Sequence, residues 1–122
     1  MPLGTAIITI NTLMIYYVYL IKTTKGFKNK SYVGFTNNIK SRLIKHNTNK
    51  GAKATRGYKW ELVYKKSFFN KSKALSYEYE LKKDRWKRFK LINVYNKKNI
   101  KIATYYLTKK IILMLCFSSI FM

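Results

Sequence analysis

The spacing of apolar and polar positions changes several times along the chain, and each change predicts a different element. The run 15–23 is rich in Val, Ile and Tyr and ends at the Gly- and Lys-containing segment TKGFKNK, which predicts a strand followed by a loop. The run 31–35 has the same β-rich composition, so the two runs predict an antiparallel hairpin with a long connection. A third strand is predicted over 60–69, after the loop GAKATRGYK.

Two other segments have the spacing of helices. After Asn37 and Asn38, either of which is a suitable N-cap, apolar residues recur at helical spacing and predict a helix that ends by NTNKG. Ser72 is the expected N-cap of a second helix, which continues to about Lys90. The order of elements is therefore β-β-α-β-α, which indicates the α+β class, with a short antiparallel three-stranded sheet flanked by helices.

The two ends of the chain differ from this pattern. We expect a leader of unclear role over 1–13, the folded domain over 14–92, and a linker with an apolar extension over 93–122. The leader has no charged side chain, so it lacks the basic start of a signal peptide. The apolar run 111–122 is shorter than the ~20 residues that a membrane helix needs. These features predict a protein that is not secreted and has no membrane anchor.

The charge of the chain narrows the classes of partner. Its 122 residues include 26 Lys and Arg against four acids, a formal net charge of +22, which favours nucleic acid as a partner over an anionic membrane surface. One Cys and one His exclude an internal disulfide, a Cys-based zinc site and a His cluster. A catalytic metal must therefore bind a carboxylate, and four are available: Glu61, Glu78, Glu80 and Asp84.

Helical spacing groups the candidate polar residues. Arg42 and His46 are four residues apart and share a face of the first helix, although periodicity alone also fits an ordinary surface arginine and a boundary histidine. Glu78 falls in one stripe with Ala74 and Leu81, so the second helix turns its carboxylate toward the apolar side. A carboxylate there needs a partner, which is either a basic side chain or a metal ion.

Five blocks in chain order resemble the GIY-YIG nuclease family: YVYLI, SYVGFT, NNIKSRLIKHN, GAKATRGYKWELVY and KALSYEYELK. YVG stands where the family has Y-I-G, and YVY stands for G-I-Y, with Tyr17 in place of the glycine. The segments GFT, HN and GAKATRGYKWELV are most similar to the Slx-type structure-specific endonucleases and to small stand-alone bacterial proteins like them. Slx-type subunits also carry a Cys-rich zinc domain, which a chain with one Cys cannot form, so it resembles the stand-alone form more.

The resemblance implies a set of site residues. The family's catalytic tyrosines fall on Tyr19 and Tyr32, its arginine on Arg42 and its metal-binding glutamate on Glu78, and His46 matches the His that often closes the first helix. It implies one divalent ion, Mg²⁺ or Mn²⁺, on the glutamate and no small-molecule cofactor. We expect Tyr32 to act as the general base, with its phenolate favoured by nearby cations, and Tyr19 to position the water or the metal.

The resemblance further implies a metal-dependent DNA endonuclease that hydrolyses phosphodiester bonds, on branched or otherwise structured DNA, in repair or recombination. Lys53, Arg56 and Lys59 are the expected contacts to the DNA backbone, although each also fits plain surface charge. The expected location is the bacterial cytoplasm or another compartment that contains nucleic acid, and the sequence points to no particular protein partner. The alternatives are a catalytically weak or inactive nucleic-acid-binding module on the same fold and a basic membrane-associated protein.

Overall fold

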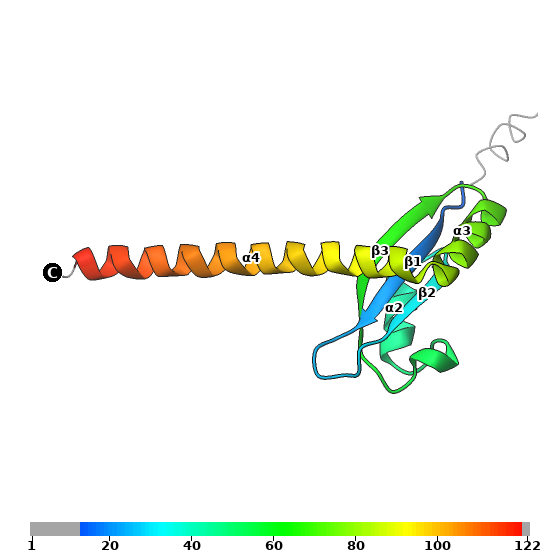
Figure 1. The fold of residues 1–122 in the computed structure, drawn as a ribbon, viewed down its shortest axis with the longest axis horizontal. Helices are drawn as coiled ribbons and strands as arrows, with labels where there is room; N and C mark the ends of the chain where they lie inside the picture. Colours follow the sequence, from blue (N-terminus) through cyan, green and yellow to red (C-terminus); the bar gives the residue numbers. More distant parts are fainter. Residues whose placement is uncertain (1–12, 121–122) are drawn as a thin grey trace, which may run out of the picture.

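The computed structural model describes residues 13–120, which form a small α+β domain from which one long helix extends (Figure 1). The elements are β1 (Tyr16–Thr23), β2 (Ser31–Thr36), α2 (Ile39–Asn47), the 3₁₀ helix η1 (Lys53–Thr55), β3 (Trp60–Phe68), α3 (Lys71–Lys83) and α4 (Arg85–Ile120). The strands form one antiparallel sheet in the order β2-β1-β3, so that β1 is central. The expected fold class is confirmed, and the elements follow the expected order β-β-α-β-α with one further helix at the end.

Alternation along β1 divides the core between the two faces of the sheet. Val18 and Leu20 are fully buried on one face, in a cluster with residues of α3 and the first turns of α4. Tyr19 and Ile21 lie on the other face, in a cluster with Trp60 and the apolar side of α2. Each fully buried aliphatic side chain contributes about 1.5–3 kcal/mol of transfer free energy. Both faces are therefore covered, and adjacent residues of β1 and β2 serve different surfaces.

Asparagine side chains cap the two helices that the sequence predicts. The side chain of Asn38 accepts a hydrogen bond from the backbone N of Ser41 at 3.0 Å, which confirms one of the two expected N-caps of α2. The N-cap of α3 is Asn70, whose Oδ1 accepts from the backbone N of Lys73 at 3.2 Å. The expectation of Ser72 as this cap was wrong, because the asparagine two residues earlier reaches the free N–H groups and Ser72 lies inside the helix.

The single helix expected after β3 is in fact two helices, separated at Asp84. This residue leaves the helical conformation, and its Oδ1 accepts from the backbone N of Lys87 at 2.9 Å, which starts α4. The Nη1 of Arg88 donates to the carbonyl of Leu81 at 2.8 Å and also to that of Lys82. The last carbonyls of α3 are thereby satisfied by a side chain of the next helix.

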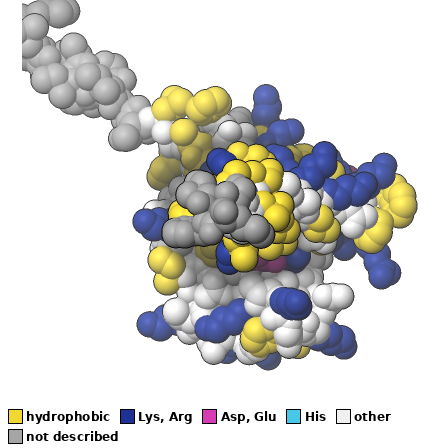
Figure 2. Space-filling view, turned by 90° about the vertical axis from the view of Figure 1, so that its left-hand side faces the viewer, with side chains coloured by type: hydrophobic (Ala, Val, Ile, Leu, Met, Phe, Trp, Pro, Cys, Tyr) yellow, Lys and Arg dark blue, Asp and Glu magenta, His cyan; other side chains and the backbone are white. Residues whose placement is uncertain are grey.

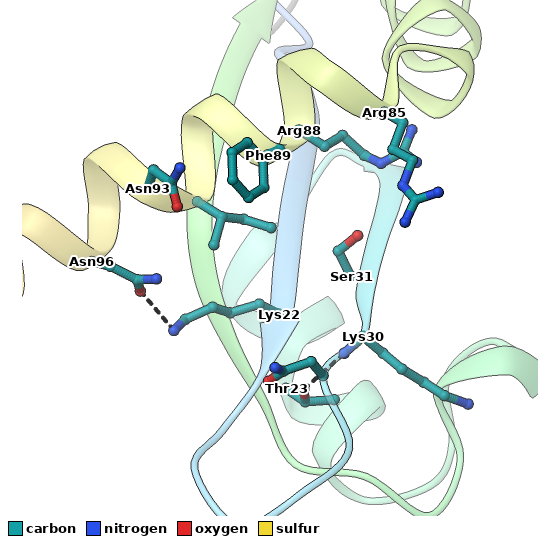
Figure 3. A pocket seen from close by; sticks show the side chains of 11 residues that line it. Lys22, Thr23, Lys30, Ser31, Arg85, Arg88, Phe89, Asn93 and Asn96 are labelled. Carbon is teal, nitrogen blue, oxygen red and sulfur yellow. Dashed lines mark hydrogen bonds between the residues drawn. The ribbon is translucent and has the colours of Figure 1, made fainter.

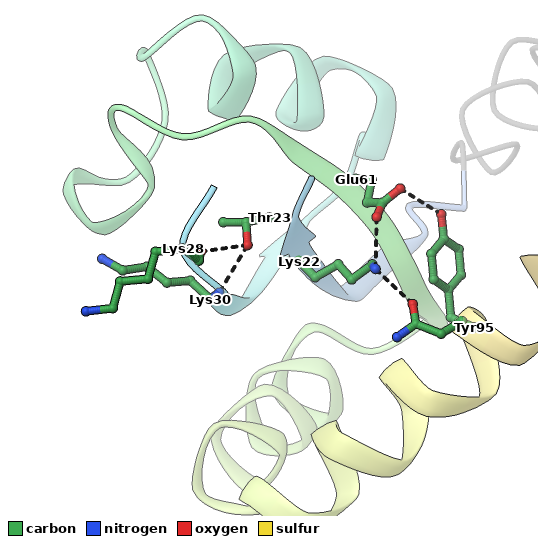
Figure 4. A network of polar contacts seen from close by, with 7 residues as sticks. Lys22, Thr23, Lys28, Lys30, Glu61 and Tyr95 are labelled. Atoms are coloured by element: carbon green, nitrogen blue, oxygen red, sulfur yellow. Dashed lines mark hydrogen bonds and ion pairs between the residues drawn. The ribbon is translucent and has the colours of Figure 1, made fainter. Parts of the chain in front are cut away.

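A polar network fixes the first part of α4 against the sheet (Figure 4). The Nζ of Lys22 in β1 lies 3.1 Å from a carboxylate oxygen of Glu61 in β3 and donates to Asn96 Oδ1 at 2.8 Å. The hydroxyl of Tyr95 donates to the other oxygen of Glu61 at 3.2 Å. These contacts hold residues 93–99 as helix, whereas the sequence indicated a linker there.

Beyond this network α4 continues without packing against the domain, through residues 111–120 of the expected apolar extension (Figure 1). Viewed from the C-terminal end of α4, hydrophobic side chains gather near the helix and Lys and Arg side chains are spread around the domain (Figure 2). No helix within residues 13–120 is both long enough and apolar enough to cross a membrane. The leader expected over 1–13 lies almost entirely outside the described residues.

Candidate active site

Four of the sequence-predicted site residues meet on the α2 face of the sheet. The hydroxyl of Tyr19, a residue only 2% exposed, lies 2.7 Å from Nε2 of His46, and Nε of Arg42 donates to the same hydroxyl at 3.4 Å. The ring of Tyr32 lies edge-on to the ring of His46, with 5.2 Å between centroids. We refer to Tyr19, Tyr32, Arg42 and His46 as the tyrosine–histidine cluster.

Hydrogen bonding around His46 determines which ring nitrogen carries the proton. The Oγ1 of Thr55 donates its proton to the carbonyl of Ala52 at 2.7 Å, so it can only accept from Nδ1 of His46, 2.9 Å away. Nδ1 is therefore protonated and Nε2 carries the free lone pair in the neutral ring. It follows that the hydroxyl of Tyr19 donates to Nε2.

The charges in the cluster follow from burial. Burial, and to a lesser extent the positive charge of Arg42, together lower the pKa of His46 to about 4. Burial raises the pKa of Tyr19 above its ordinary value, although its hydrogen bond to Arg42 opposes this. The same hydrogen bond raises the pKa of Arg42. At neutral pH the contacts therefore join a neutral phenol, a neutral imidazole and a guanidinium cation, and for Tyr19 burial outweighs the nearby cation.

Two glycines leave space for the cluster. Gly34 pairs with Tyr19 across the hairpin, and a Cβ added there would overlap the phenol. A Cβ added at Gly51 would lie 2.6 Å from Nδ1 of His46, where Thr55 makes its hydrogen bond. The glycine of YVG is thus required by the close approach of a side chain.

The loop after α2 folds back under His46 because Asn47 holds its far end. Asn47 Oδ1 accepts from the backbone N of Trp60 at 2.7 Å, and its Nδ2 donates to the carbonyl of Trp60 at 3.1 Å. The indole Nε1 of Trp60 donates in turn to the carbonyl of Thr55 at 2.9 Å. Sequence reasoning identified neither Asn47 nor Thr55 as site residues, although both lie in the blocks HN and ATR that carried the family resemblance.

Glu78 makes no hydrogen bond to the tyrosine–histidine cluster within residues 13–120. Its carboxylate lies 2.9 Å from Nζ of Lys82, one turn further along α3, and its side chain is 15% exposed. Its negative charge makes only a small contribution to the raised pKa of Tyr19, whose main cause is burial. Glu80 is exposed, so the two carboxylates point in different directions, as the helical spacing predicted.

The donor set at Glu78 fits a hard cation that keeps most of its water. Nowhere in residues 13–120 do three or more His, Cys, Asp and Glu side chains form a group that could hold a metal. Mg²⁺ needs no such group, because it binds through one or two carboxylates and retains several waters. A single carboxylate on a partly exposed helix face is compatible with that mode of binding.

The three basic residues expected to contact DNA differ in their surroundings. Lys53 begins η1 and Arg56 is its C-cap, and both side chains are exposed. The Nζ of Lys59 instead donates to the carbonyl of Asn47 at 2.8 Å and so helps to close the loop. Among the described residues, the side chains of Lys53 and Arg56 therefore make no such hydrogen bond within the fold, unlike that of Lys59.

Comparisons with known proteins relate the chain to one family. The family model described as the GIY-YIG catalytic domain matches residues 15–99. UPF0213 protein OB0043 of Oceanobacillus iheyensis is 43% identical over 79 residues, which cover 63% of this chain and 88% of that protein. UPF0213 protein SSP2268 of Staphylococcus saprophyticus is 41% identical over 80 residues, with coverages of 64% and 94%. The solution structure of UPF0213 protein BH0048 from Bacillus halodurans shares 35% identity over 66% of this chain and 85% of that one, with a TM-score of 0.38.

Proposed function

The chain belongs to the GIY-YIG family, and from this premise we propose that it is a metal-dependent endonuclease that hydrolyses phosphodiester bonds in DNA. The observation that carries the proposal is the tyrosine–histidine cluster, in which two phenols, an imidazole and a guanidinium meet beside the edge strand β2. Such a set offers a proton acceptor and a fixed positive charge, both of which phosphodiester hydrolysis requires.

Tyr32 is the better candidate for the general base. Tyr19 is almost fully buried and its proton is already donated to His46, so it is poorly placed to take a proton from water. Tyr32 is partly exposed and lies against the same imidazole ring. We assign the removal of the proton from the attacking water to the phenolate form of Tyr32, which becomes the neutral phenol in this step, and the positioning of Arg42 and His46 to Tyr19.

Arg42 supplies positive charge to the phosphoryl group. Its side chain is partly exposed, its Nε is directed at Tyr19, and the guanidinium also interacts with Tyr32, so a phosphate beside Tyr32 would meet this charge. The raised pKa of Arg42 keeps this charge in place at every working pH. The arginine would therefore stabilise the charge that develops on the non-bridging oxygens.

Glu78 would hold the divalent ion, Mg²⁺ or Mn²⁺. Its carboxylate pairs with Lys82, whose side chain is 50% exposed, so the ammonium can move into solvent when a cation takes its place. A bound ion would neutralise phosphate charge and help the departing oxygen.

The net charge of +22 supports DNA as the substrate, and exposed Lys53 and Arg56 are the proposed contacts to its backbone. Branched or otherwise structured DNA is the proposed substrate class, in repair or recombination, which places the protein in a compartment that contains nucleic acid. A second candidate function is DNA binding without cleavage. The ion pair of Glu78 and the replacement of the first glycine by Tyr17 favour it.

Cleavage of labelled branched, flap and duplex DNA separates the two functions. The wild type should cut at least one substrate with Mg²⁺ or Mn²⁺ and none with chelator, and Glu78→Gln should bind DNA as well as the wild type and cut nothing. Glu80→Gln is the matched control, because it removes an exposed carboxylate two residues away on the same helix and should cut normally. Binding without cleavage by the wild type on every substrate would overturn the nuclease and leave the binding module.

A further inference from the structure

A cavity of about 420 Å³ opens on the face of the sheet opposite the tyrosine–histidine cluster (Figure 3). It lies between the connection of β1 to β2 and the first turns of α4, and we call it the α4 pocket. Four basic residues line it, Lys22, Lys30, Arg85 and Arg88, and no acidic residue does. The pocket therefore offers a net positive surface that the proposed cleavage chemistry does not use.

Part of this positive charge has no counterpart in the fold. Lys22 forms its ion pair with Glu61, and Arg88 is engaged with the carbonyls of α3. Arg85 has neither an ion pair nor a hydrogen bond among the described residues, and its side chain extends from α4 toward Ser31 of β2 (Figure 3). A guanidinium in this position can bind an anionic oxygen pair in a bidentate manner.

The pocket also has an aromatic wall. Phe89 lines it and is 51% exposed, and it stacks on Trp86 with 5.5 Å between ring centroids. The amides of Asn93 and Asn96 lie beside it in the same lining. Cations, amides and an exposed ring together match a nucleotide better than a simple anion, because a base can cover the ring while the phosphate meets the cations.

The register of β2 connects the pocket with the proposed active site. Ser31 pairs with Lys22 on the pocket side, whereas the next residue, Tyr32, pairs with Ile21 on the cluster side. Since β2 is an edge strand, a nucleic acid strand that passes over this edge reaches both faces. A single strand can make this turn, whereas a stiff duplex cannot.

We propose that the α4 pocket binds a nucleotide of an unpaired DNA strand that continues from the phosphodiester at Tyr32 over the edge of β2. The phosphate lies at Arg85, and the base stacks on Phe89. The inference rests on the proposed nuclease function for the path of the strand, and it extends that function by making a single-stranded arm a requirement for tight binding.

Binding of flap DNA and of duplex DNA of equal length, both measured in chelator, tests the pocket. Arg85→Glu should weaken flap binding about tenfold more than duplex binding, whereas Lys98→Glu should weaken both equally. Lys98 is the matched control, because it is an exposed cation further along α4 and outside the pocket, and the two variants change the net charge equally. Phe89→Ala should weaken flap binding about tenfold and leave duplex binding unchanged, since stacking of one base is lost.

Equal weakening of both DNAs by Arg85→Glu and Lys98→Glu would overturn the proposal, as would wild-type flap affinity in Phe89→Ala. Circular dichroism establishes that each variant is folded, and neither Arg85 nor Lys98 makes a hydrogen bond or ion pair in the described part of the chain whose loss would unfold it. Because binding is measured in chelator, the DNA is not cut during the assay and the result does not depend on cleavage. Absence of cutting would refute the nuclease alone, and failure of the flap preference would refute the pocket alone.

Discussion

Replacement of Thr55 by valine tests the hydrogen-bond chain that fixes His46. Thr55 is fully buried, its Oγ1 accepts from Nδ1 of His46 at 2.9 Å, and it donates to the carbonyl of Ala52 at 2.7 Å. Valine has nearly the same shape without the hydroxyl, so Thr55→Val changes the hydrogen bonds and leaves the packing almost intact. The imidazole then has a buried N–H with no acceptor.

The structure gives the size of the effect. A buried donor left without a partner costs about 1–3 kcal/mol. The cost at the carbonyl of Ala52 is smaller, because this oxygen still accepts a hydrogen bond from the backbone N of Thr55 at 3.0 Å. In a domain of this size each 1 kcal/mol lowers the melting temperature by roughly 4–8 °C. We therefore expect Thr55→Val to lower it by roughly 8–16 °C, for a loss of about 2 kcal/mol.

Thermal unfolding followed by circular dichroism measures the loss, and Thr55→Ser is the control. Serine keeps the hydroxyl and removes one buried methyl group, which costs about 0.8 kcal/mol. Nitrogen NMR of the single histidine gives an independent readout: Nδ1 should be protonated in the wild type and in Thr55→Ser, and the two tautomers should mix in Thr55→Val. A wild-type ring with Nδ1 unprotonated, or a valine variant as stable as the serine variant, would refute the reasoning.

Three further predictions concern the same cluster. The free energy of unfolding should fall by about 3 kcal/mol as the pH drops from 6.5 toward 4, because the unfolded chain binds a proton at His46 that the folded chain excludes. Urea unfolding measures this loss, and the pH dependence should vanish in His46→Gln. Gly34→Ala should lower stability by about 1–3 kcal/mol in the same assay and displace Tyr19, and an unchanged midpoint would contradict the overlap. Tyr32→Phe should abolish cleavage in a fully stable protein, whereas Tyr19→Phe should also cost about 1 kcal/mol of stability. The cleavage rate of the wild type should rise with pH above neutral, and a flat profile would count against a tyrosine base.

Much of the fold could be predicted from local pattern, and the exceptions have physical causes. The strands and α2 have strong periodicity and suitable caps, so their positions agree with the sequence to within one or two residues. The break at Asp84 was missed because an aspartate can either continue a helix or cap the next one. Residues 93–99 are polar and looked like a linker, but contacts of Tyr95 and Asn96 with the sheet hold them as helix. Contacts between distant parts of the chain leave no periodic signal.

The site was predictable in its residue types and less so in its geometry. The resemblance located Tyr19, Arg42 and His46, which do come together. It did not identify Thr55, because the hydrogen bond to a ring nine residues earlier depends on how the loop closes. The protonation states of the cluster could not be predicted from the sequence either. A chain so rich in lysine suggests phenols with lowered pKa values, whereas burial raises the pKa of Tyr19.

The departure of the first motif from G-I-Y can be judged from what surrounds each glycine position. Gly34 of the second motif lies under the phenol of Tyr19, so a side chain there would displace the cluster. Tyr17, which replaces the first glycine, is partly exposed near the start of β1, and the ammonium of Lys65 lies 6.0 Å from the centroid of its ring. Its side chain therefore has room beside the cluster and disturbs none of the hydrogen bonds of Tyr19. The glycine that the geometry requires is present, and the one that is lost was not needed for these contacts.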